Sequence, residues 1–227
     1  DVTFTTTAIV IDADDVLIDL NDYSISGGGT GTLCIGLSSG ADNVTVRNGV
    51  LKDAAHGIFT TTFGVGLNNG FTCQNVTFED CTTTGLEFGN ARTFTAAPFT
   101  FVPIQGSGFI VQDCVFVDCP GALSFTATSA LVQRCNAQTP AGGESLCDFS
   151  GAQIIMEDCL FTAFDANVGT DNGFLQDLVM RRCSAVGGNG FRLSTTFNNI
   201  LKCIPKDRTV NQHRGRFYRL LESCIRM

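Results

Sequence analysis

The chain has 227 residues, which is long enough for one domain with a hydrophobic core, and it carries a net charge of −8 at pH 7. That charge disfavours binding to nucleic acid, and no apolar run is long enough to cross a membrane. Only 16% of the residues are charged, whereas glycine occurs 25 times. This composition favours many short strands joined by tight turns.

Seven segments share one pattern of apolar residues: LIDLNDYSI, VTVRNGVL, FTCQNVTF, FIVQDCVF, ALVQRCNA, IIMEDCLF and LVMRRCSA. Apolar residues two positions apart predict strands with one face inward. The predicted inward columns are Ile18, Val44, Phe71, Phe109, Ala130, Ile154 and Leu178; Leu20, Val46, Cys73, Val111, Val132, Met156 and Met180; and Ile25, Leu51, Phe78, Phe116, Ala137, Phe161 and Ala185.

A polar position inside each segment predicts a tight bend, because Asn and Asp tolerate left-handed backbone. The predicted bend column is Asp22, Asn48, Asn75, Asp113, Arg134, Asp158 and Arg182. A third strand is expected in most repeats, near Leu33, Ile58, Leu86, Leu123 and Phe191. Three strands per repeat, stacked ~4.8 Å apart, predict three parallel sheets around a filled interior. A β-sandwich is the alternative, but it does not explain why residue types recur at one place in every repeat.

The run IDLNDYSISGGG followed by NVTVRNGVLKDAAHGI resembles the right-handed parallel β-helix repeats of the pectin-lyase-like superfamily, over roughly residues 9–197. The resemblance implies an all-β, right-handed, three-sheet parallel β-helix, a solenoid of about seven coils over residues 1–196. It implies no single activity, because that superfamily includes lyases, hydrolases, phage tailspikes, adhesins and structural proteins.

The 11 cysteines include no CxxC pair, so a zinc cluster has little support. Cys114, Cys135, Cys159 and Cys183 share one column just after the bend, and Cys81 and Cys119 share another. Stacked neighbours lie within reach of a disulfide. Their inward position favours buried thiols instead, because a free cysteine packs as a small apolar residue.

Two segments depart from the repeat. Residues 89–105 form an insertion, whose Phe94, Phe99 and Phe101 predict either a contact with a partner or glycan or a flap packed against the chain itself. Residues 197–227 carry a net charge of +5, against −13 for the preceding body. Helical spacing of apolar residues in this tail predicts a cap over the last coil. The alternative is an assembly segment that binds an acidic neighbour through Arg214, Arg216, Phe217 and Arg219.

No catalytic residue, cofactor site or metal site is predicted. AHGIF around His56 resembles the histidine motif of polygalacturonases, but the other motifs of that family do not follow in order. Asp12, Asp14 and Asp15 cluster at a turn, where acidic residues are common. Two sequons, beginning at Asn43 and Asn75, are potential glycosylation positions if the protein is secreted.

The sequence therefore predicts a non-catalytic scaffold or adhesin module of an extracellular or particle-surface assembly. Its expected partners are other protein subunits, in a homo- or hetero-oligomer, or a surface glycan. A polysaccharide-degrading lyase or glycoside hydrolase is the alternative. A hydrolase would need two outward carboxylates on adjacent coils, ~5–9 Å apart in a groove.

Overall fold

The computed structural model describes residues 2–3, 6–38, 40–60, 68–88, 106–138, 147–162, 175–186 and 202–204. Within these ranges the protein is all-β, with 16 strands and no helix. The pairings between strands are parallel and join them into one large sheet network. The predicted all-β class and the predicted parallel pairing are therefore confirmed.

Most strands are short, and a few long ones continue through a bend. In chain order they are β1 (Val2–Thr3), β2 (Thr7–Ile11), β3 (Leu17–Asp19), β4 (Ser24–Leu37), β5 (Thr45–Thr60), β6 (Thr72–Glu79), β7 (Thr84–Phe88), β8 (Phe109–Gln112), β9 (Val115–Val117), β10 (Gly121–Gln133), β11 (Asn136–Gln138), β12 (Cys147–Glu157), β13 (Leu160–Thr162), β14 (Leu175–Arg181), β15 (Ser184–Val186) and β16 (Lys202–Ile204).

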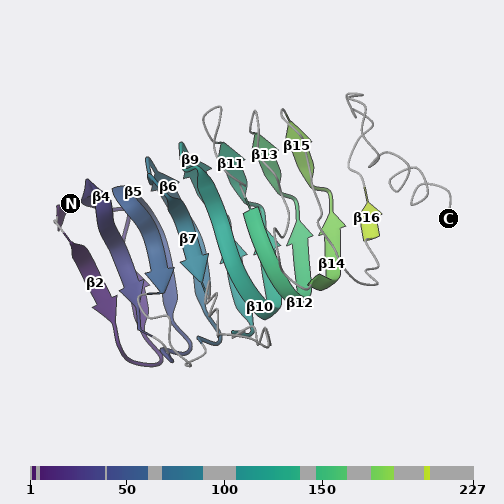
Figure 1. Cartoon of the computed structure of the whole chain (residues 1–227), viewed down its shortest axis with the longest axis horizontal. Helices are drawn as coiled ribbons and strands as arrows, with labels where there is room; N and C mark the ends of the chain where they lie inside the picture. Colours follow the sequence, from purple (N-terminus) through teal and green to yellow (C-terminus); the bar gives the residue numbers. More distant parts are fainter. Residues whose placement is uncertain are drawn as a thin grey trace, which may run out of the picture.

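The strands pair along three tracks that pass through successive repeats. Track one joins β3, β5, β6, β8, β10, β12, β14 and β16. Track two joins β1, β4, β5, β6, β9, β11, β13 and β15. Track three joins β2, β4, β5, β7, β10 and β12. The long strand β5 takes part in all three, and the strands succeed one another along the long axis of the molecule (Figure 1).

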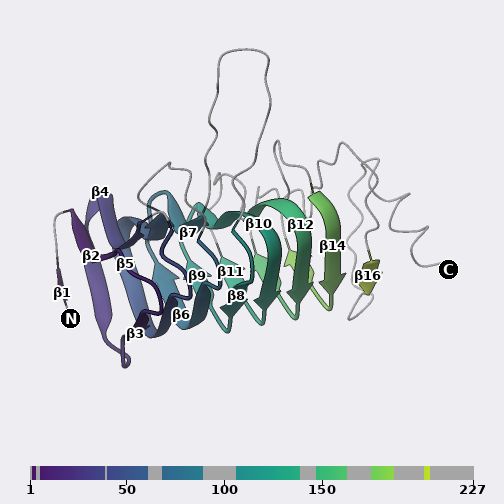
Figure 2. The same ribbon diagram turned by 90° about the horizontal axis from the view of Figure 1, so that it is seen from below.

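Track one extends beyond the expected end of the repeat. β16 pairs in parallel with β14, with Met180 opposite Cys203. In the side view, β16 follows β14 along the same axis (Figure 2). The parallel pairing thus continues past residue 196, where the sequence pattern indicated that the solenoid stops.

The register confirms most of the predicted inward columns. The column that runs from Ile25 through Phe78 and Phe116 to Ala185 is reproduced at every step. The column that begins at Val46 is reproduced as far as Met180. Because these positions are fixed by the side-chain period of two, a slip of one residue would turn the whole apolar set outward.

Two predicted column positions, Ile18 and Leu20, are wrong. Ile18, not Leu20, lies opposite Val46, because the first bend is longer than the later ones and contains a turn closed by Tyr23 N–H donating to Leu20 O (2.8 Å). Ile18 consequently does not belong to the column that was predicted to begin with it. The third strand expected near Leu33 is part of β4, in which Leu33 lies opposite His56 and Ile35 lies opposite Ile58. Phe191 lies outside the described residues.

Three bends join the tracks, and each uses left-handed backbone. At the predicted bend column, called bend A, all seven residues have φ between 52° and 65°. Bend B, between tracks two and three, has Asp53, Asp80 and Asp118 with φ of 52–53°. Bend C, between track three and the next strand of track one, contains Asp15, Asn43, Gly70 and Gly108 with φ of 57–71°. Asn, Asp and Gly reach this region at the least cost, which explains why they recur at these positions.

The core is a continuous apolar cluster that runs through the stacked repeats. Phe78 and Phe116 stack within it, with ring centroids 4.8 Å apart and an interplanar angle of 3°. Gly57 and Gly85 lie against these rings, where an added Cβ would collide with an aromatic carbon. Side chains of the three tracks therefore fill the interior from all sides.

Candidate functional site

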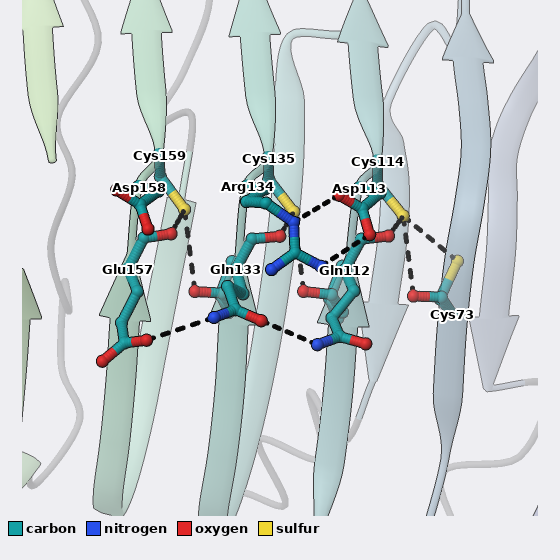
Figure 3. A network of polar contacts seen from close by, with 12 residues as sticks. Cys73, Gln112, Asp113, Cys114, Gln133, Arg134, Cys135, Glu157, Asp158 and Cys159 are labelled. Atoms are coloured by element: carbon teal, nitrogen blue, oxygen red, sulfur yellow. Dashed lines mark hydrogen bonds and ion pairs between the residues drawn. The ribbon is translucent and has the colours of Figure 1, made fainter. Parts of the chain in front are cut away.

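Polar side chains on the outer side of track one hydrogen-bond from each repeat to the next (Figure 3). Gln112 Nε2 donates to Gln133 Oε1 (2.8 Å), and Gln133 Nε2 donates to Glu157 Oε2 (3.2 Å). Arg181 Nη1 then donates to Glu157 Oε1 (2.7 Å). This polar ladder joins four successive repeats, so its donors and acceptors are engaged with one another rather than presented to a substrate.

Ion pairs at bend A continue the same arrangement. Arg134 donates from Nε and Nη2 to the two carboxylate oxygens of Asp113 (2.6 and 2.8 Å), and Arg182 binds Asp158 in the same way (2.6 and 2.7 Å). The hydrogen bonds from Arg134 lower the pKa of the Asp113 carboxyl. Such bidentate pairs are more specific in geometry than single contacts, although their exposure to water limits their strength.

A ladder of thiols lies just inside bend A. Cys114, Cys135 and Cys159 each donate to the carbonyl two residues earlier, and each also contacts a carbonyl of the preceding repeat, at 3.2–3.6 Å. Cys114 Sγ also lies 3.7 Å from Cys73 Sγ (Figure 3). Eight cysteines are free, and all of them except Cys183 are buried: Cys34, Cys73, Cys81, Cys114, Cys119, Cys135, Cys159 and Cys183. The interpretation as buried thiols holds for these residues.

The thiols of Cys159 and Cys34 are held in their protonated form. A hydrogen bond with the Cys135 thiol, together with burial, raises the pKa of Cys159 to about 12. Burial also raises the pKa of Cys34 to about 12. Because the thiolate is the nucleophile and the metal ligand, these shifts oppose both roles. Among the described residues, no group of three or more His, Cys, Asp or Glu side chains is arranged to hold a metal ion.

One polar cluster is not part of these ladders. His56 of β5 and Thr84 of β7 occupy the same position in successive repeats, and Glu87 follows Thr84 by three residues. His56 Nδ1 lies 2.6 Å from Thr84 Oγ1 and 3.3 Å from Glu87 Oε2, and Thr84 Oγ1 donates to Glu87 Oε2 (3.0 Å). The His56 ring contacts the Phe59 ring, with centroids 4.5 Å apart. We call these four residues the His56 cluster.

The His56 cluster lies on the outer side of track three. Ile58 and Leu86 are core residues of β5 and β7, and Phe59 and Glu87 directly follow them. Since successive side chains of a strand point to opposite faces, Phe59 and Glu87 point away from the core, and His56 contacts both. The side chains of His56 and Glu87 are nevertheless only 17% and 14% exposed. The sequence motif singled out His56 but missed Thr84 and Glu87, which the repeat register of track three would have placed beside it.

Bend B carries carboxylates on successive repeats. Asp53, Asp80 and Asp118 follow the last residues of track two in three successive repeats, and Ser26 Oγ donates to Asp53 Oδ2 (2.9 Å). Stacked strands lie ~4.8 Å apart, so the backbones that carry these neighbouring carboxylates are about as far apart as the two carboxyl groups of a retaining glycosidase.

The acidic turn and the two sequon residues take part in bend C and bend A. Asp14 Oδ1 accepts from the backbone N–H of Asp42 (2.9 Å), and Asp15 Oδ1 accepts from Asn43 Nδ2 (2.9 Å). Asn75 Nδ2 donates to Asn48 Oδ1 (3.2 Å). Both sequon asparagines are exposed at bends, and a glycan on either would be attached to the Nδ2 atom that donates the hydrogen bond between repeats.

The other sequence-predicted contact residues lie outside the described residues. These are Phe94, Phe99 and Phe101 of the insertion and Arg214, Arg216, Phe217 and Arg219 of the tail. No helix in the part of the chain that is described is long and apolar enough to cross a membrane.

Comparison of this chain with protein-family models, with curated proteins and with solved structures finds no match.

Proposed function

We propose that the chain is a right-handed, three-sheet parallel β-helix of the pectin-lyase-like kind, and that it serves as a non-catalytic scaffold or adhesin module of an extracellular or particle-surface assembly. Three parallel tracks joined by three recurring bends support the coiled path. The right hand is supported by the general preference of parallel crossovers for that hand. About seven coils accord with the seven repeats of the sequence.

The observation that carries the scaffold proposal is the internal pairing of the outer polar side chains. In Asp19–Arg47, Asp113–Arg134, Asp158–Arg182 and Glu157–Arg181, each partner lies on the neighbouring repeat. A catalytic carboxylate has to meet a substrate, whereas these carboxylates hold one repeat to the next. Their arrangement is suited to stiffening an elongated body.

The free thiols indicate the redox state of the compartment in which such a module would fold. Disulfides form in oxidising compartments, and free thiols persist where the surroundings are reducing. The buried thiol ladders therefore favour a particle-surface module that folds in a reducing compartment over one that folds during secretion.

Light scattering of the full chain after size-exclusion chromatography tests the assembly part of the proposal. We expect a mass that rises with protein concentration, and less association at high salt, because the acidic body and the basic tail would attract each other. Replacing Arg214, Arg216 and Arg219 by Glu is expected to abolish the rise, whereas replacing the same three by Lys preserves it. A monodisperse monomer that binds no glycan would contradict the proposal.

The carboxylate column of bend B favours a second candidate, a polysaccharide-degrading enzyme. Asp80 lies between Asp53 and Asp118 in this column, so Asp80 is the residue whose loss would remove a neighbour from both. In this candidate Asp80→Asn abolishes turnover of a polysaccharide, whereas a scaffold has no turnover to lose.

A further inference from the structure

We infer that the His56 cluster is a binding site for a neutral carbohydrate, in which the free ring nitrogen of His56 accepts a hydrogen bond from a sugar hydroxyl. This inference deepens the adhesin part of the proposed function and rests on it. The cluster consists of His56, Phe59, Thr84 and Glu87, on two neighbouring strands of track three.

The hydrogen bonds of the cluster fix the tautomer of His56. Thr84 has a single hydroxyl hydrogen, and it is donated to Glu87 Oε2 at 3.0 Å. The contact of 2.6 Å between His56 Nδ1 and Thr84 Oγ1 must then take its hydrogen from Nδ1. In the neutral imidazole the lone pair consequently lies on Nε2.

The Nε2 atom of His56 is available to accept a hydrogen bond from a ligand. Among the described residues, no hydrogen bond to this atom is formed, and Glu87 and Thr84 both lie on the Nδ1 side of the ring. When a carboxylate and a hydroxyl hold one ring nitrogen of a histidine, the orientation of the ring is fixed. The same arrangement occurs in metal sites, where the other ring nitrogen binds the metal. Thr84 and Glu87 are thus positioning residues, and His56 is the contact residue.

The neighbouring ring points to the ligand class. Phe59 packs against the imidazole, so an apolar ring stands beside a hydrogen-bond acceptor. Binding sites for small ligands combine aromatic side chains with a few placed polar groups, and a sugar offers both an apolar C–H face and hydroxyl donors. The Glu87 carboxylate and the charge of −13 on the body oppose an acidic sugar, which leaves a neutral one.

The first test determines which ring nitrogen of His56 carries the hydrogen. Two-dimensional ¹H–¹⁵N NMR of the full chain reports the tautomer of each histidine, and a His213→Gln variant assigns the two signals. We expect a protonated Nδ1 and an unprotonated Nε2 for His56. A hydrogen on Nε2 of the neutral His56 imidazole would overturn the inference and would leave the scaffold proposal unaffected.

Affinity electrophoresis then measures binding to soluble starch, mixed-linkage β-glucan and galactomannan, with pectin as the acidic comparison. We expect retardation by at least one neutral polymer and none by pectin. His56→Ala should weaken that binding about fivefold or more, the loss of one neutral hydrogen bond, and Phe59→Ala should also weaken it. Arg47→Gln, on the same strand but in an ion pair outside the cluster, is the matched control and should bind as the parent does.

Each outcome decides between the two proposals. Binding that survives His56→Ala and Phe59→Ala overturns this site but keeps the adhesin. Absence of binding to all three neutral polymers, or binding to pectin alone, also overturns the site, and the light-scattering result then decides whether a scaffold remains.

Discussion

The guanidinium of Arg134 binds both carboxylate oxygens of Asp113, at 2.6 and 2.8 Å, from a residue whose own backbone is left-handed, with φ of 52°. Arginine is uncommon in this backbone region, where asparagine and aspartate are favoured. The same combination recurs two repeats along, at Arg182 and Asp158. An ion pair between repeats therefore accompanies the less favourable backbone choice at both places.

Arg134→Asn separates the two effects. Asparagine suits the left-handed backbone but loses the ion pair, so we expect a small change in the urea midpoint that shrinks further in high salt. Arg134→Val loses the pair and also places a β-branched residue at positive φ, so we expect a clearly larger loss in the same titration. Equal losses for the two variants would show that the backbone conformation is not what distinguishes this position.

Stability in acid should depend on Asp113. Hydrogen bonds from Arg134 lower the pKa of this carboxyl in the folded protein below its ordinary value of 3.8. Its contribution is therefore present above the unfolded pKa and is lost as the pH falls through the lower folded pKa. Between pH 4 and pH 2 we expect Asp113→Asn to lose less stability than the parent does, as measured by urea unfolding at each pH. A parallel decline in parent and variant would contradict the pairing.

Stability in alkali should depend on the thiol ladder. The folded pKa of Cys159 is raised to about 12 from an ordinary value of 9.0, so its contribution is present below pH 9 and is lost as the pH rises toward 12. In that window, Cys159→Ala should reduce the slope of unfolding free energy against pH by up to ~1.4 kcal/mol per pH unit, the value for one proton. An unchanged slope would mean that this thiol titrates alike in the folded and unfolded chain.

The stacked rings of Phe78 and Phe116 should contribute a large share of the stability of the core. Phe116→Ala leaves a cavity beside Phe78 and is expected to cost ~3–5 kcal/mol in denaturant unfolding. Tyr23→Ala is a suitable control, because Tyr23 is 61% exposed and its removal opens no core cavity. If both variants lost the same amount, the interior would not be packed as described.

Gly57 and Phe78 should be coupled energetically. A Cβ at Gly57 would collide with the Phe78 ring, so Gly57→Ala is expected to cost ~1–3 kcal/mol by overpacking. Phe78→Ala removes the ring carbons but leaves the backbone carbonyl oxygen of Gly85, which the new Cβ would also meet, so in that background Gly57→Ala should cost less but still destabilise. A double-mutant cycle measures the difference, and strict additivity of the two losses would contradict the contact.

The sequence was sufficient to predict the parts of this fold that depend on periodicity. Columns such as Leu51–Phe78–Phe116 and the left-handed bend at Asn48 and Arg134 follow from alternation and from turn chemistry. Positions next to an irregular bend could not be predicted, since the longer turn at Leu20–Tyr23 shifts Ile18 into another column.

The His56 cluster could not be predicted from any single repeat of the sequence. His56 and Thr84 are 28 residues apart and meet only because their strands stack in register. Their residue types differ, so no recurring pattern connected them, and Glu87 was hidden within a strand that the sequence placed only by its apolar Leu86. Pairing between unlike side chains on adjacent repeats becomes visible only once the register is known.

The most direct test of the scaffold account is an activity assay of the full chain against neutral and acidic polysaccharides, with and without calcium. It follows new reducing ends and the ultraviolet absorbance of unsaturated products. The account predicts no turnover on any polymer. Turnover that is abolished by Asp80→Asn, and retained by Asp113→Asn, would contradict it and identify the bend B carboxylates as an active site.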